Sequence, residues 1–196
     1  MNVCRQMSSP TIGAMRKLKR IGRYLRHRPR AKLLYAWQGH DAMIHCHSDS
    51  DWAGDKATRR SVSGGVLYRG SHCIKSWAKL QSVVAKSSAE AELYAAGRAA
   101  TEALGAAAYL RDLGQRRSVR LHLDSSSALS LISKTGLGKA KHIEIQHLWL
   151  QEAVRSKRLE CSKIHTDVNS GDLLTKSLAA DRVVLLMDIC GYKFDR

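Results

Sequence analysis

A long alanine-rich helix is the strongest structural signal in this chain, and it restricts the folds that the sequence can adopt. Residues 88–113 carry apolar side chains at spacings of three and four, which is the period of a helix with one buried face: Leu93, Ala96, Ala100, Leu104, Ala107 and Leu110. Ser87 or Ser88 can cap its start, with Glu90 close behind, and Gly114 can end it. The alanine content predicts close packing of this helix against a sheet.

Short apolar runs on both sides of this helix predict the strands of that sheet. Three strands precede the helix and form an antiparallel meander, at residues 42–49, 65–69 and 72–78. Two more strands follow it, at residues 118–123 and 159–165. Further helices are expected at residues 125–134, at residues 142–157, and from an Asn169 cap to about residue 178. This order predicts one α/β domain with a mixed five-stranded sheet, in which crossover connections join the later strands.

The charge of the chain points to a polyanionic partner. There are 33 Lys and Arg residues against 17 Asp and Glu, for a formal net charge of +16. Residues 1–40 hold ten of these cations and no acid, and subtracting those ten charges from +16 leaves +6 for the rest. Nucleic acid is the first candidate partner and an anionic membrane the second. The alternative is a basic protein whose charge serves only solubility.

The basic segment contains a predicted helix at residues 10–28, with apolar residues at helical spacing and cations on the other faces. Two interpretations are open and compatible. The helix can contact phosphates, or its apolar stripe can pack on a neighbouring protein segment.

Cysteine usage and hydropathy exclude several classes of protein. The five cysteines form no CxxC pair and their number is odd, which argues against a disulfide framework or a zinc site and favours a reducing compartment. No apolar run approaches the length of a membrane span, and the basic run at residues 16–32 is not followed by the apolar region of a signal peptide. We therefore expect no membrane partner and no small-molecule cofactor.

Four acids fall where predicted elements would bring them together. Asp49 and Asp124 end predicted strands, Glu92 lies near the start of the long helix, and Asp172 opens the last helix. Ligands of open α/β sheets tend to bind at the carboxyl ends of the strands. Residues two apart on a helix point away from each other, so Glu92, rather than Glu90, can reach the sheet.

Converging carboxylates repel one another unless a cation lies between them. With no Cys or clustered His ligands, Mg²⁺ or Mn²⁺ is the natural choice, and two such ions can clamp the oxygens of a phosphodiester. Each acid also has a simpler explanation. Asp49 and Asp51 can be turn residues, Glu92 a surface residue, and Asp124 and Asp172 helix-capping residues. The metal interpretation depends on the four acids occurring together.

A nearly continuous series of motifs runs through residues 42–178: SDSDWAGD, TRRSVSGG, SWAKLQSVVAKSSAEAELYAA, LHLDSSSAL, KHIEIQHLWLQE and GDLLTK. In residues and order these motifs resemble the ribonuclease H domain of copia-type LTR retrotransposon polyproteins. The preceding PTIGAMRKLKRIGRYL is similar to the tail of the reverse transcriptase that leads into that domain. The resemblance implies a ribonuclease H-like fold over residues 41–180, a basic helical segment over residues 1–40 and a C-terminal tail over residues 181–196.

The resemblance also assigns site residues. It implies that Asp49, Glu92, Asp124 and Asp172 are catalytic carboxylates that hold two Mg²⁺ ions, with Mn²⁺ as a possible substitute. His165 resembles a loop histidine that assists product release or proton transfer, or it is a surface histidine at a strand end. Nucleic-acid contacts are expected from Arg60, Lys139, Lys141 and His142, and from five cations of the N-terminal helix: Arg16, Lys17, Lys19, Arg20 and Arg23. The family often has Asn where this chain has Ser125, and Ala where it has Gly171; neither change removes a carboxylate.

The function implied is a metal-dependent endonuclease that hydrolyses the RNA strand of RNA/DNA hybrids. Its partners would be the hybrid and the polymerase portion of a retroelement polyprotein, inside a cell, in a cytoplasmic virus-like particle or the nucleus. Motifs of polymerase, integrase and protease are absent, so the chain is expected to be a fragment or a decayed copy of a polyprotein. Two alternatives are a non-catalytic nucleic-acid-binding relic and a nuclease of the same fold with another substrate.

Overall fold

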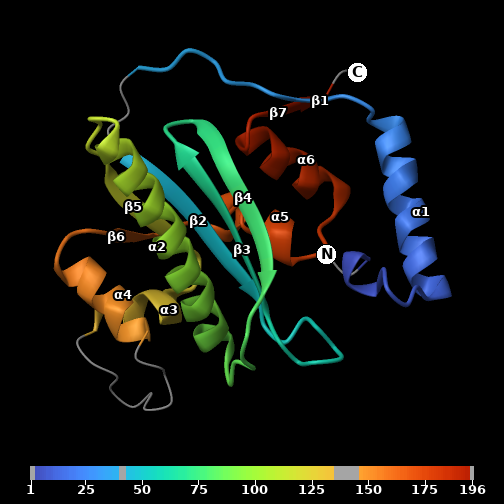
Figure 1. Cartoon of the computed structure of the whole chain (residues 1–196), viewed down its shortest axis with the longest axis horizontal. Helices are drawn as coiled ribbons and strands as arrows, with labels where there is room; N and C mark the ends of the chain where they lie inside the picture. Colours follow the sequence, from blue (N-terminus) through green and yellow to red (C-terminus); the bar gives the residue numbers. More distant parts are fainter. Residues whose placement is uncertain (1–2, 40–42, 135–145, 195–196) are drawn as a thin grey trace. The chain divides into compact units, whose positions relative to one another are not determined.

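The computed structural model describes residues 3–39, 43–134 and 146–194 (Figure 1). The chain divides into two compact units. One comprises Met1–Leu34 together with Tyr192–Arg196, and the other comprises Tyr35–Gly191. The candidate acids all belong to the second unit.

A five-stranded mixed sheet forms the centre of the second unit, with the strand order β4-β3-β2-β5-β6. Its strands are β2 (Met43–Asp51), β3 (Val62–Arg69), β4 (His72–Leu80), β5 (Ser118–Leu123) and β6 (Glu160–Lys163). Strands β2, β3 and β4 pair antiparallel, whereas β5 is parallel to β2 and β6 is parallel to β5. The predicted meander and the two parallel strands are confirmed. Strand β2 runs two residues beyond Asp49, which was expected to end it.

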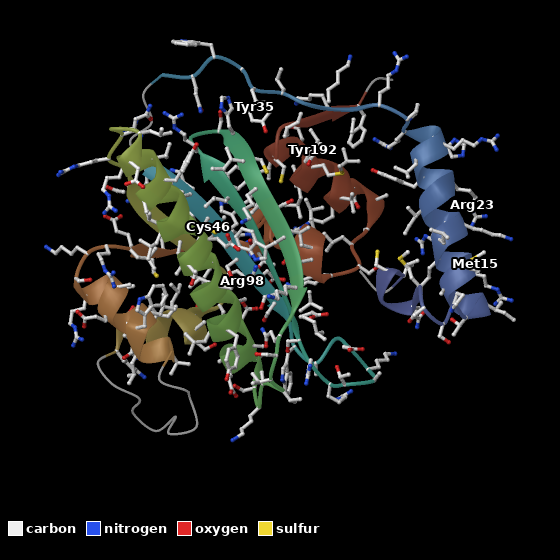
Figure 2. The ribbon with its side chains drawn as sticks, viewed as in Figure 1. Met15, Arg23, Tyr35, Cys46, Arg98 and Tyr192 are labelled. Atoms are coloured by element: carbon white, nitrogen blue, oxygen red, sulfur yellow. The ribbon has the colours of Figure 1, made fainter. Side chains whose placement is uncertain are left out.

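Helix α2 (Ser88–Asp112) crosses one face of this sheet. Its N-cap is Ser87, whose side chain accepts a hydrogen bond from the Glu90 amide. The face of α2 that meets the sheet is built from fully buried alanines, which let the helix approach the apolar side chains of the strands: Ala96, Ala99, Ala100 and Ala103. Cys46 of β2 belongs to this core (Figure 2). The predicted packing of the alanine-rich helix on a sheet is therefore confirmed.

Helices α3 (Ser126–Ser133) and α4 (Gln146–Arg155) extend the same layer. Ser125 caps α3 by accepting a hydrogen bond from the Ala128 amide. Ile132 and Leu150 are buried and join the core beneath α2.

The opposite face of the sheet carries α5 (Asp172–Thr175), because the side chains that meet it alternate with those that meet α2. A Cβ atom added to Gly64 of β3 would lie 2.6 Å from Thr175 Cγ2 and 3.0 Å from Leu174 Cβ. Gly64 is the strand partner of Asp49. The glycine of β3 thus allows α5 to pack directly beside Asp49.

The C-terminal part of this unit differs from the prediction. One helix from an Asn169 cap to about residue 178 was expected, but the structure has a 3-10 turn η2 (Thr166–Val168), the short α5 and a separate helix α6 (Ala180–Ile189). Asn169 does not cap α5, whose N-cap is Gly171. Its side chain instead donates to the Ser48 carbonyl at 3.1 Å and accepts from the Gly171 amide at 3.1 Å. Asn169 therefore fastens the segment to β2 instead of starting a helix.

The first unit contains η1 (Cys4–Gln6), α1 (Ile12–His27) and the two-stranded pairing of β1 (Ala31–Leu33) with β7 (Tyr192–Phe194). Thr11 caps α1, accepting a hydrogen bond from the Ala14 amide at 3.1 Å. The guanidinium of Arg28 lies 4.7 Å from the Phe194 ring centroid. Met15 and Arg23, both on α1, represent its apolar and basic residues (Figure 2). In the described parts of the chain, no helix combines the length and apolar character needed to cross a membrane.

Candidate active site

The pairing of β2 with β5 places Asp49 beside Asp124. The two strands are parallel neighbours, and Ser48 is the strand partner of Leu123. Asp49 and Asp124 are the next residues along the two strands, so both lie at the carboxyl edge of this strand pair. The adjacency that the sequence prediction required is present.

Glu92 of α2 completes a group of three carboxylates. One oxygen from each of Asp49, Glu92 and Asp124 lies within 4.8 Å of the other two. Asp49 is fully buried and Glu92 is 9% exposed. Glu90 is also buried but points elsewhere, accepting a hydrogen bond from the Lys86 amide at 2.7 Å. The helical geometry that favoured Glu92 over Glu90 is confirmed.

The two oxygens of Glu92 have unequal surroundings. Oε1 accepts a hydrogen bond from the Ser50 amide at 3.3 Å, whereas Oε2 is buried without a hydrogen-bond partner among the residues that the structure describes. Burial and the charges of Asp49 and Asp124 raise the pKa of Glu92 to about 8. Burial also raises the pKa of Asp49 to about 6, against the opposing contacts with Thr175 and Lys176. Both raised pKa values mean that Asp49 and Glu92 would lose their protons more readily if a cation lay beside them.

The donor set fits a hard divalent cation. Three carboxylates with an unsatisfied buried oxygen supply oxygen ligands alone, which suit Mg²⁺ or Mn²⁺ and not zinc. A bound cation would use the lone pairs of Glu92 Oε2 and offset the repulsion that raises the pKa values of Asp49 and Glu92.

Three histidines of β2 and β5 lie shortly before Asp49 and Asp124 in the chain, but they do not belong to the three-carboxylate group. His45 Nδ1 lies 3.1 Å from His122 Nε2, and the other ring nitrogen of His122 lies 2.9 Å from Ser162 Oγ. Burial and the neighbouring histidines lower the pKa of His47 to about 3, and burial with His45 and Arg120 lowers the pKa of His122 to about 4. These two rings are therefore neutral near pH 7 and add no charge to the acids.

Asp172 lies on another side of Asp49. It opens α5 and is 2% exposed, but it does not belong to the three-carboxylate group. The ammonium of Lys176 lies between the two acids, 3.0 Å from Asp49 Oδ1 and 2.8 Å from Asp172 Oδ1. Thr175 donates a hydrogen bond to the other oxygen of Asp49. Asp172 is thus joined to Asp49 through a lysine.

Lys176 was not singled out from the sequence. Its signal is the spacing of four residues from Asp172, which places both side chains on one face of a helix. Such pairs are common on helix surfaces, where they contribute little, so the spacing alone does not reveal that Asp172 is buried.

His165 lies outside the carboxylate group. Its side chain is 77% exposed, and Nδ1 accepts a hydrogen bond from the Asp167 amide at 3.2 Å. The next residue, Thr166, donates to Asp124 Oδ2 at 3.1 Å. His165 therefore sits one residue from a contact to the site, and its proposed role stays a prediction.

Of the other two acids of the first motif, Asp51 ends β2 and Asp55 lies in the connection from β2 to β3. Asp51 accepts a hydrogen bond from the Val62 amide, which closes the connection between β2 and β3. Asp55 accepts from Thr58 Oγ1 at 2.6 Å. Arg60 lies in the same connection, where its carbonyl accepts a hydrogen bond from the Asp55 amide at 3.1 Å.

The remaining predicted nucleic-acid contacts are divided between α1 and the segment before α4. All five candidate cations of α1 are exposed: Arg16, Lys17, Lys19, Arg20 and Arg23. Lys139, Lys141 and His142 lie outside the described residues. For all of these side chains, contact with nucleic acid stays a prediction.

Comparison with solved structures identifies the fold class. The chain is similar to LC11-RNase H1, isolated from compost by a metagenomic approach, with a TM-score of 0.55, 15% identity, and coverage of 69% of this chain and 94% of that one. The same protein in complex with an RNA/DNA hybrid gives a TM-score of 0.51 at 14% identity, covering 67% and 93% of the two chains. The chain therefore has the ribonuclease H-like α/β fold, as predicted.

Sequence relatives identify the family. The retrovirus-related Pol polyprotein from transposon TNT 1-94 of Nicotiana tabacum is 33% identical over 193 residues, which cover 96% of this chain and 14% of the polyprotein. The corresponding polyprotein from transposon RE1 of Arabidopsis thaliana is 32% identical over 176 residues, which cover 88% and 12%. No family model matches the chain.

The chain belongs to the family of retrovirus-related Pol polyproteins from copia-like transposons, and its fold is that of ribonuclease H domains. It spans 14% and 12% of the lengths of these two polyproteins.

Proposed function

We propose that this chain is a metal-dependent endonuclease that hydrolyses the RNA strand of RNA/DNA hybrids. The observation that carries the proposal is the convergence of Asp49, Glu92 and Asp124, which lie within 4.8 Å of one another at the carboxyl edge of a ribonuclease H-like sheet. A strongly basic chain with a local acidic pocket suits a polyanionic substrate and a metal-assisted reaction.

The side chains of the site are held in place by the fold. Asp49 is fixed by Thr175 and Lys176, and Glu92 by the Ser50 amide. These contacts support a site in which Asp49, Glu92 and Asp124 would hold Mg²⁺, with Mn²⁺ as a substitute. The cation would supply Lewis-acid activation of water and of the scissile phosphodiester.

The proposed substrate rests on the family and on the charge distribution. One structural neighbour was solved in complex with an RNA/DNA hybrid, and the exposed cations of α1 suit phosphate contacts that do not depend on sequence. RNA would be distinguished by its 2′-hydroxyl through backbone groups near Glu92 and the turn after β2. The polymerase portion of a polyprotein is the proposed protein partner, because the relatives are Pol polyproteins.

The test is cleavage of a labelled RNA/DNA hybrid with Mg²⁺, compared between the wild type, Asp49→Asn and Asp124→Asn. The wild type should cleave only the RNA strand, and each substitution should lower the rate by at least about 100-fold, because it removes a proposed metal ligand. Circular dichroism must show that the three proteins are equally folded. Binding of the hybrid without cleavage would favour the non-catalytic relic, and cleavage of duplex DNA or duplex RNA in preference to the hybrid would favour a different nuclease.

A further inference from the structure

The acids of the candidate site form two groups, and the negative charge of each group is compensated differently. Asp49 belongs to both groups, one with Asp172 and the other with Glu92 and Asp124. On one side, Asp49 and Asp172 share the ammonium of Lys176, at 3.0 and 2.8 Å. On the other side, Asp49 meets Glu92 and Asp124, and in the described parts of the chain neither of those two acids forms an ion pair. A cation is therefore already present on the Asp172 side alone.

The Asp172 side has its remaining oxygens occupied as well. Asp172 Oδ2 lies 3.4 Å from Arg182 Nη2, and Asp49 Oδ2 accepts a hydrogen bond from Thr175. The Asp172 side chain is 3% exposed, whereas the Lys176 side chain is 37% exposed. The lysine therefore reaches the buried carboxylates from the surface of the protein. Charge-assisted hydrogen bonds to two buried carboxylates hold an ammonium firmly.

On the side of Glu92, in contrast, Glu92 and Asp124 lack a positively charged partner among the described residues. Glu92 Oε2 is buried without a hydrogen-bond partner among the described residues. Its neighbours there are Asp49 and Asp124, which offer further oxygen ligands and no positive charge of their own. This side needs a cation, and it has the donors to bind one.

We propose that the site binds a single divalent cation, on Asp49, Glu92 and Asp124, and that Lys176 supplies the positive charge on the Asp172 side. This inference rests on the proposed function, because it concerns the same metal site. It replaces the pair of ions expected from the family resemblance by one ion and one ammonium. Asp172 is then a positioning residue that holds Lys176 beside Asp49, and not a metal ligand.

The decisive measurement is the number of ions bound by the metal-free full chain. Mn²⁺ alone is titrated calorimetrically, and unbound Mn²⁺ is followed by its electron paramagnetic resonance signal. The wild type should bind one ion. Lys176→Met, which keeps the length of the side chain but removes its charge, should bind two, because Asp49 and Asp172 then lack their shared cation. Lys176→Arg is the matched control and should bind one.

The outcomes separate this proposal from the proposed function. Two ions on the wild type would overturn the role of Lys176 and leave the metal-dependent function standing. One ion on Lys176→Met would also overturn it. A folded wild type that binds no Mn²⁺ would contradict the proposed function itself.

A second variant keeps the proposal testable if Lys176→Met does not fold. Asp172→Asn should still bind one ion, with affinity less than about tenfold weaker, because the residue is not a ligand and only a neighbouring charge is removed. Loss of all Mn²⁺ binding in folded Asp172→Asn would show that Asp172 ligates the ion and would overturn the assignment.

Discussion

Glu92 is an unfavourable residue for this fold when no cation is bound beside it. It is almost fully buried, one of its oxygens lacks a partner among the described residues, and two other carboxylates are its neighbours. Its raised pKa means that the folded chain holds a proton which the unfolded chain releases. Such a group lowers stability at neutral and alkaline pH, which is a common cost of a functional site.

We therefore expect Glu92→Gln to stabilise the metal-free fold. Between the ordinary glutamate value of 4.5 and the folded value of about 8, the folded state binds more protons than the unfolded state. The free energy of unfolding of the wild type therefore falls across that window as the pH rises. Glu92→Gln removes this loss, so its advantage should be absent near pH 4 and reach on the order of 4–5 kcal/mol at pH 8.5.

Urea unfolding in EDTA across this pH range measures that advantage. Glu90→Gln is the matched control, because it alters a buried carboxylate of the same helix that lies outside the three-acid group. Added Mg²⁺ should stabilise the wild type but not Glu92→Gln, since only a ligand that prefers the folded state raises its stability. A Glu92→Gln protein that is less stable than the wild type at pH 8.5 in EDTA would contradict this account.

At this scale, local rules account for only part of the prediction of the site. Strand parity places Asp49 and Asp124 at one edge, and helical geometry favours Glu92 over Glu90. Parity puts Asp51 on the same face as Asp49, so the choice of Asp49 rests on the family resemblance. Lys176 could not be found in the same way. Its importance comes from a contact with Asp49, 127 residues away in the chain, and no local pattern encodes that contact.

At the scale of elements, α5 is a four-residue helix whose position is set by contacts and not by its length. Glycines create the space for it. A Cβ on Gly64 of β3 would lie 2.6 Å from Thr175 Cγ2, and a Cβ on Gly171 would lie 3.0 Å from Asp49 Cβ. The placement of Lys176 between the two acids depends on this close approach.

Gly64→Ala should displace α5 from the sheet. Its added Cβ would lie 2.6 Å from Thr175 Cγ2 and 3.0 Å from both the Gly171 carbonyl oxygen and Leu174 Cβ, so a backbone segment must move. We expect a loss of about 1–3 kcal/mol in the free energy of unfolding, measured by urea denaturation. Gly97→Ala is the control. Its Cβ meets nothing within 4 Å, so this change within α2 should be neutral or stabilising by up to about 1 kcal/mol. Equal effects of the two substitutions would show that α5 is not held by Gly64.

The elements that the sequence did not predict share a physical reason. Strands β1 and β7 have three residues each and pair across the length of the chain, so they lack a local signal. Asn169 is a good helix cap by residue type, but its side chain is bound to the Ser48 carbonyl of β2, and this tertiary contact overrides the local preference. In contrast, the alternation of apolar and polar residues along β2 and β5 is a local signal, and it predicted that Asp49 and Asp124 would lie at one edge if the two strands were neighbours.

At the scale of the whole molecule, the basic charge is concentrated in a segment that is separate from the acids. Residues 1–40 carry ten cations and no acid, and the three-carboxylate group lies in the other compact unit. The exposed cations of α1 alternate with exposed apolar residues, which include Met15 and Leu18. This composition suits both predicted roles of the helix, as a phosphate-contacting arm and as a surface for the polymerase portion.

The phosphate-contacting role makes a quantitative prediction about salt. When one cation that binds a phosphate is removed from a protein, the slope of log affinity for nucleic acid against log salt concentration falls by about 1. Replacing Arg16, Lys19 and Arg23 by Gln should therefore weaken binding of an RNA/DNA hybrid and lower that slope by about 2–3. Fluorescence anisotropy in EDTA, over a range of NaCl concentrations, measures the slope without cleavage of the substrate.

The control must remove the same charge from elsewhere. Replacing Arg111, Lys157 and Arg158, which are exposed outside α1, lowers the net charge equally. If α1 contacts the phosphates, this control should retain nearly the wild-type slope, because only cations near the backbone release counterions. Equal reductions of the slope in the two triple variants would show that net charge, and not α1, determines the binding. If the slope of log affinity against log salt concentration did not change in the α1 variant, the cations of α1 would not contact phosphates. The apolar residues of α1 would then be the candidate binding face of the helix.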